Sequence, residues 1–73
     1  MDYVDRLTGL REDKDIDQRT ISNLLNCQQS AISKYECRRA KYKIEDIVKL
    51  CLFYNVSADY ILGLPDNLPY PKR

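Results

Sequence analysis

Residues 16–36 hold two short helical patterns on either side of a tight corner, and this run constrains the fold more than any other part of the chain. Asp17 is a good N-cap for the first of these helices, because its carboxylate can accept hydrogen bonds from the free N–H groups of the first helical turn. The apolar residues that follow have the spacing of one buried helix face: Ile21, Leu24 and Leu25. Asn26 tolerates the left-handed backbone of a helix end, so a second helix is expected from about residue 28 or 29 to residue 36.

The second of these helices has a polar outward face that is nearly free of acidic residues. Ile32 and Tyr35 form its inward side, and the outward side carries Gln29, Ser30, Ser33 and Lys34. These side chains can contact base edges, because glutamine can bind adenine with both amide atoms, serine donates or accepts, and lysine reaches guanine or phosphate. Taken alone, such a face is usually only solvated. The corner beside it is what favours a role with DNA.

The pattern continues downstream in blocks with regular spacing. Apolar residues recur at Ile44, Ile47 and Leu50, and residues 55–57 (Asn-Val-Ser) lead into the run of residues 59–64. Together with residues 16–36, these blocks resemble the Cro/repressor type of helix-turn-helix domain, also called the XRE family, over roughly residues 4–67. The resemblance implies an all-α, compact, five-helix lambda-repressor-like domain in residues 1–64. Residues 65–73 contain all three prolines and are expected to form a short extended tail.

The other three helices are expected from their own apolar spacing. Residues 3–14 place Val4, Leu7 and Leu10 on one side. Residues 44–54 have a broad apolar surface that predicts a central core helix: Ile44, Ile47, Val48, Leu50, Cys51 and Tyr54. Asn55 should end that helix, and Ser57 should cap a short one over residues 58–62 that Gly63 terminates.

The resemblance also implies roles for individual residues. The side chains expected to contact bases in the major groove are Gln28, Gln29, Ser30, Ser33 and Lys34. Gln18 would bind a DNA phosphate at the start of the preceding helix. Arg11 would pair with Glu36 and tie the first helix to the recognition helix, although two unrelated surface charges are the alternative.

The charge of the chain is small but unevenly distributed. Its net charge is +1, yet residues 1–17 hold six acids against three bases, and residues 34–43 hold five bases against one acid. The loop of residues 37–43 departs from the family pattern, which has a glycine at position 38 and a better cap than Lys43. Four basic residues near this loop are candidates for phosphate contacts: Arg38, Arg39, Lys41 and Lys43. A merely solvated basic loop is the alternative.

These expectations favour a sequence-specific, double-stranded-DNA-binding transcriptional regulator, of repressor type, that binds its operator as a homodimer. The dimer candidates are Phe53, Tyr60, Ile61 and Leu64, although burial in the core explains Phe53 and Ile61 equally well. The alternative function is a protein-interaction module, such as an antitoxin-like regulatory subunit with the same fold. A net charge near zero and the irregular loop favour that alternative.

The composition argues against an enzyme and against a metal site. The chain has no histidine, no glycine-rich phosphate loop and no acid pair in an apolar setting. Cys27 and Cys51 are expected to pack in the core, while Cys37 should be partly exposed and a redox role for it stays open. No cofactor, small-molecule ligand or membrane span is expected, and the protein should be cytoplasmic.

Overall fold

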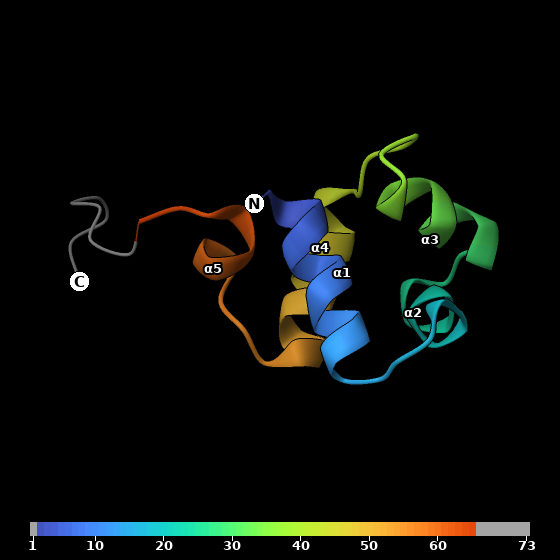
Figure 1. Cartoon of the computed structure of the whole chain (residues 1–73), viewed down its shortest axis with the longest axis horizontal. Helices are drawn as coiled ribbons and strands as arrows, with labels where there is room; N and C mark the ends of the chain where they lie inside the picture. Colours follow the sequence, from blue (N-terminus) through green and yellow to red (C-terminus); the bar gives the residue numbers. More distant parts are fainter. Residues whose placement is uncertain (1, 66–73) are drawn as a thin grey trace.

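The computed structural model describes residues 2–65, and within them it forms five helices and no strand (Figure 1). The helices are α1 (Tyr3–Asp13), α2 (Gln18–Leu25), α3 (Gln29–Glu36), α4 (Ile44–Tyr54) and α5 (Ala58–Leu62). Helices α2 and α3 lie at one end of the molecule and α5 at the other, with α1 and α4 between them. The expected all-α, five-helix fold is confirmed. Of the expected tail, residues 66–73 lie outside the described residues.

The helix ends are set by the local chemistry that the sequence predicts. The Asp17 carboxylate accepts from the N–H of Thr20 at 2.8 Å, and the Ser57 hydroxyl accepts from the N–H of Tyr60 at 3.1 Å. Three helices end in the left-handed conformation, at Asn26 (φ 55°), Asn55 (φ 57°) and Gly63 (φ 70°).

Helix α1 begins with a capping box that the sequence analysis did not identify. The Asp2 carboxylate accepts from the N–H of Asp5 at 3.0 Å, and the Asp5 carboxylate accepts from the N–H of Asp2 at 3.4 Å. Both carboxylates also have a second partner far along the chain, which matters for the site below.

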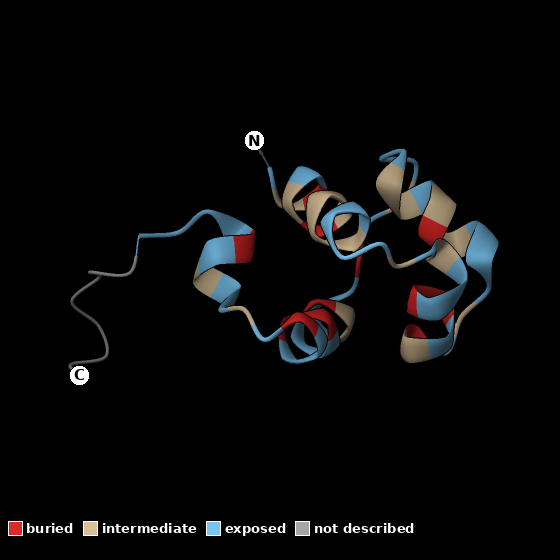
Figure 2. Ribbon diagram, turned by 60° about the horizontal axis from the view of Figure 1, so that its bottom comes forward, coloured by how far each residue is buried: buried red, intermediate tan, exposed pale blue. Residues whose placement is uncertain are grey.

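The core draws on every helix and on one loop residue. Its most deeply buried side chains are Ile32 of α3, Leu50 of α4 and Ile61 of α5. Figure 2 shows the buried positions on the inward sides of the helices. The rest of the buried cluster consists of Leu7, Ile21, Leu25, Tyr42, Ile47, Cys51 and Tyr54. Because Ile32 is inaccessible to solvent, the position of α3 is fixed by the core itself.

The three cysteines are free thiols in different surroundings. Cys51 is buried, and Cys27 is half-buried against the core, as the sequence predicts. Burial raises the pKa of both thiols, so they stay protonated near neutral pH. Cys37 is exposed at the end of α3.

The prediction that all six apolar residues of α4 belong to the core is wrong for two of them. Ile44 is 71% exposed and Val48 is 53% exposed. The buried side of α4 consists of Ile47, Leu50, Cys51 and Tyr54. Given 3.6 residues per turn, Val48 lies roughly 110° and Ile44 roughly 70° around the helix from the middle of that side. The other helices therefore cover only one side of a wide apolar surface.

Candidate nucleic-acid interface

Helices α2 and α3 meet at a corner of three residues, 26–28, whose geometry follows from its sequence. Asn26 takes the left-handed conformation, and the N–H of Cys27 donates to the carbonyl of Ser22 at 2.9 Å. The Cys27 side chain packs against the core, which holds the corner down from the inside. Ile32 anchors α3 in the same core. The two short helices thus form a rigid pair with one face of α3 turned outward.

The outward face of α3 carries the side chains expected to contact bases. Gln28, Gln29, Ser30 and Lys34 are exposed, and Ser33 is half-buried. Ile32, on the opposite side of the helix, is buried. The single acid of α3, Glu36, is engaged inside the fold and does not oppose an anion at this face. Four of the five predicted base-contacting residues are thus exposed in α3 or just before it, Ser33 is half-buried, and no carboxylate lies among them.

An ion pair joins the end of α3 to α1. The Nε and Nη2 atoms of Arg11 donate to the two carboxylate oxygens of Glu36 at 2.7 and 2.9 Å. These side chains are only 16% and 10% exposed, and the hydrogen bonds to Glu36 raise the pKa of Arg11. The Nη1 atom of Arg11 donates to the carbonyl of Ile16 at 3.0 Å, just before α2. The structure thus brings Arg11 and Glu36 together, as the resemblance implies.

Gln18, the predicted phosphate ligand, belongs to the same network. Its Nε2 atom donates to the Oε1 atom of Glu36 at 2.9 Å. One N–H of the amide is therefore used inside the fold, and the second N–H is left for another acceptor. Gln18 ties the start of α2 to the end of α3, so it positions α3 whether or not it also contacts DNA.

The loop of residues 37–43 is anchored by Tyr42. Its ring is 9% exposed and lies 4.5 Å from the ring centroid of Tyr35 and 6.4 Å from that of Tyr3. Tyr42 is thus a core residue that anchors this irregular loop. On either side of it the basic residues Arg39, Lys41 and Lys43 are exposed. None of these three makes a salt bridge within residues 2–65.

Lys43 is the N-cap residue of α4, and it is a poor cap, as the sequence predicts. Its side chain makes no capping hydrogen bond. Glu45 and Asp46 in the first turn of α4 instead place negative charge near the positive end of the helix.

Arg38, a fourth candidate for phosphate contact, is already paired. Its Nη2 atom donates to Asp2 at 2.9 Å and to Asp5 at 2.8 Å. The backbone N–H of Asp5 and the Arg38 guanidinium hold the pKa of Asp2 below its ordinary value. Arg38 also has φ 62°, a left-handed conformation that glycine adopts more readily. The two carboxylates at the start of α1 therefore bind the Arg38 cation just after the end of α3.

The four dimer candidates divide into two groups. Phe53, Tyr60 and Leu64 are 42%, 48% and 49% exposed, whereas Ile61 is 0% exposed. A side chain without accessible surface cannot contact a second protein, which leaves only the core role for Ile61.

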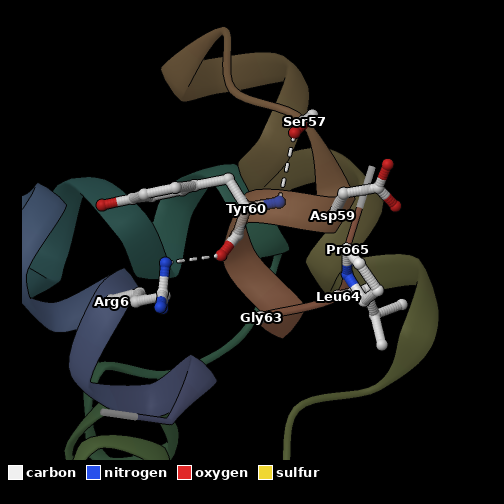
Figure 3. Close-up of a pocket in the computed structure, with 7 residues that line it drawn as sticks. All are labelled: Arg6, Ser57, Asp59, Tyr60, Gly63, Leu64 and Pro65. Carbon is white, nitrogen blue, oxygen red and sulfur yellow. Dashed lines mark hydrogen bonds between the residues drawn. The ribbon is translucent and has the colours of Figure 1, made fainter. Parts of the chain in front are cut away.

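An open recess of about 570 Å³ lies between α1 and α5 (Figure 3). Arg6 donates to the carbonyl of Tyr60 at 3.0 Å, and its guanidinium lies 4.9 Å from the centroid of the Tyr60 ring. The other lining residues are Ser57, Asp59, Gly63, Leu64 and Pro65. These contacts hold α5 on α1, at the opposite end of the molecule from α3.

One further exposed basic residue lies beside the predicted phosphate ligand Gln18, although no motif pointed to it. Arg19 is exposed in the first turn of α2, next to Gln18. A cation there is unfavourable for the helix dipole, which is the signal that could have singled it out. Among the described residues there is no group of metal-binding side chains. Residues 2–65 also contain no helix long and apolar enough to cross a membrane.

Comparison with known proteins gives a sequence relative and a structural likeness. No model of a known protein family matches the chain. An uncharacterized HTH-type transcriptional regulator of Bacillus subtilis (strain 168), YobD, is 34% identical over 70 residues, which are 96% of this chain and 62% of that protein. The crystal structure of a transcriptional regulator from Listeria innocua matches with a TM-score of 0.80 and 23% identity, over 90% of this chain and 62% of that one. The chain thus spans about three fifths of the length of both.

Proposed function

We propose that this chain, a helix-turn-helix protein by its fold, is a DNA-binding transcriptional regulator whose helix α3 enters the major groove. The sequence relative of helix-turn-helix type and the structural likeness support this proposal. The observation that carries it is the outward face of α3. Five polar or basic side chains project there, while Ile32 and the Arg11–Glu36 pair hold the helix from behind. A surface that contains amides, hydroxyls and a cation but no acid suits base edges and phosphates.

The basic loop supplies the part of the interface that does not depend on sequence. Arg39, Lys41 and Lys43 are exposed on a loop that Tyr42 anchors, so their charges lie beside the recognition helix. Contacts from such residues to phosphates provide much of the affinity for any duplex. We further propose that the protein acts as a repressor of the XRE type and binds a near-palindromic operator as a homodimer, with two α3 helices about 34 Å apart.

Selection of bound duplexes from a random pool, at about physiological salt, tests this function. The expected result is enrichment of a near-palindrome with half-sites about 10 base pairs apart. Retention of DNA without an enriched sequence would contradict sequence-specific regulation. Absence of retention would favour the alternative, a protein-interaction module that has kept the fold.

Replacing both Asp2 and Asp5 with asparagine should strengthen binding to every duplex. Asparagine still caps a helix, so α1 should persist, whereas the cation of Arg38 would be free to contact a phosphate. One added phosphate contact should steepen the dependence of log K on log salt by about one. The measurement is fluorescence anisotropy with specific and random duplexes at several salt concentrations.

The same double substitution in an Arg38→Ala background is the matched control for that experiment. Removing two negative charges near DNA raises affinity even without a new contact, and the control isolates this general effect. If the Asp2 and Asp5 replacements change the salt slope equally with and without Arg38, the release of Arg38 is refuted.

A further inference from the structure

Helix α4 exposes a row of three large apolar side chains on successive turns, here called the α4 stripe: Ile44, Val48 and Leu52. They are 71%, 53% and 77% exposed, which makes them the three most exposed large apolar side chains of residues 2–65. Their spacing of four residues places them one above another along one side of the helix. Scattered apolar residues on a surface are ordinary, but a continuous row marks an interaction surface.

The α4 stripe is separate from the core that the fold already completes. The neighbouring part of the apolar surface, formed by Ile47, Leu50, Cys51 and Tyr54, is buried against the other helices. The helix therefore has two apolar sides, and only one of them is covered within the described part of the chain. A helix that is apolar on most of its circumference is characteristic of a buried element.

We propose that the α4 stripe is covered by the α4 stripe of a second copy of this chain. The row is symmetric about Val48, because Ile44 and Leu52 lie four residues before and after it. Two α4 helices packed antiparallel about a two-fold axis beside Val48 would place Ile44 next to the partner's Leu52 at both ends. An interface of this isologous kind requires a surface that is complementary to itself, and the stripe meets that requirement.

The charges along one edge of the α4 stripe favour the same partner. Glu45 and Lys49 are both exposed, lie one turn apart, and form no salt bridge within residues 2–65. In the antiparallel arrangement each Glu45 approaches the partner's Lys49. An edge with one charge of each sign matches itself, whereas a strongly acidic or strongly basic partner would meet one like charge.

The size of the surface predicts a weak dimer in the absence of DNA. A stable complex buries about 800 Å² on each partner, which would be about one seventh of the 5549 Å² accessible surface of this chain. Three side chains and their edges supply part of that area, so a micromolar dissociation constant is expected. Binding to adjacent half-sites would raise the effective concentration of the two copies and stabilise the pair. Only this last step rests on the proposed function.

Sedimentation equilibrium of the full chain, from about 1 µM to about 1 mM, tests the interface directly. The parent protein should dimerise in this range, and Val48→Glu should raise the dissociation constant at least about tenfold. Leu64→Glu is the matched control, because Leu64 is about as exposed as Val48 but follows α5. Circular dichroism should show the same helix content for all three proteins, since neither substitution touches the core. Leu52→Glu serves as a second disrupting variant.

A charge exchange tests the antiparallel arrangement itself. Glu45→Lys and Lys49→Glu should each weaken the dimer, and the double variant should restore it, because each reversed charge then meets a reversed partner. If the single variants lose dimer affinity and the double variant does not recover it, the pairing of Glu45 with Lys49 is overturned.

Three other results overturn the proposal, and each is distinct from a failure of DNA binding. A parent protein that stays monomeric throughout the range has no such dimer. If Leu64→Glu disrupts the dimer and Val48→Glu does not, the interface lies at the α5 end of the molecule. A dimer that appears only after removal of residues 66–73 shows that this segment covers the stripe. Binding to a duplex with one half-site reports the proposed function separately, since it requires a single copy.

Discussion

Replacing Glu36 with glutamine is expected to lower the free energy of unfolding by about 3 kcal/mol. The Glu36 carboxylate accepts two hydrogen bonds from Arg11 and one from Gln18, at 2.7 to 2.9 Å, and is only 10% exposed. Glutamine has nearly the same shape but leaves the guanidinium of Arg11 without its counter-charge in a poorly solvated position. Breaking one side of such a pair costs more than the intact pair contributes, because the remaining charge stays buried.

Thermal unfolding followed by circular dichroism measures this loss. For a domain of this size, about 3 kcal/mol corresponds to a decrease in melting temperature of roughly 12–24 °C. Glu12→Gln is the control, since Glu12 is exposed near the end of α1 and makes no salt bridge within residues 2–65, so its neutralisation should leave the melting temperature nearly unchanged. Selectivity between specific and random duplexes should change less than stability does. An unaltered melting temperature for Glu36→Gln would count against a structural role of the pair with Arg11.

Much of the fold could be predicted because its determinants are local. Asp17, Asn26, Asn55, Ser57 and Gly63 act on the backbone within a few residues, so their chemistry indicates where helices begin and end without knowledge of the tertiary structure. The periodicity of apolar residues predicts the existence of a helix for the same reason. The outward face of α3 followed from the position of Ile32 on the opposite side.

The features that the sequence did not reveal depend on contacts between distant residues. Arg38 meets Asp2 and Asp5 across more than thirty residues of sequence, and Tyr42 meets Tyr3 across almost forty. Nothing in the local pattern of the loop distinguishes Tyr42 from an exposed tyrosine. Only its place beside two other rings shows that it anchors the loop, and hence that the neighbouring basic residues have defined positions.

Helix α4 shows a second limit of sequence patterns. The apolar arc of α4 is wider than one neighbouring layer can cover, and periodicity cannot tell which part of it is covered. Ile44 and Val48 are as apolar as Ile47 and Leu50, yet only the latter two are buried. The assignment depends on where α2 and α5 pack, which is a property of the whole fold.

The second large effect is expected at the proposed DNA-binding surface, from Gln29→Ala. Gln29 is exposed in the first turn of α3, and its amide can donate to and accept from one adenine edge at once. Its loss should weaken binding to the selected site by about 1–3 kcal/mol, a factor of roughly 5 to 150. Affinity for random DNA should hardly change, because that binding depends on phosphate contacts. Anisotropy titrations with both duplexes at one salt concentration give the comparison.

Lys41→Ala provides the opposite pattern and therefore the control for Gln29. Lys41 is exposed on the basic loop and has no partner among the described residues, so its loss should weaken specific and random duplexes alike and reduce the salt slope by about one. The ratio of specific to random affinity separates the two roles. Loss of a base contact lowers this ratio, and loss of a phosphate contact leaves it constant. Equal losses on both duplexes for Gln29→Ala would remove Gln29 from base recognition and shift that role to Ser33 and Lys34.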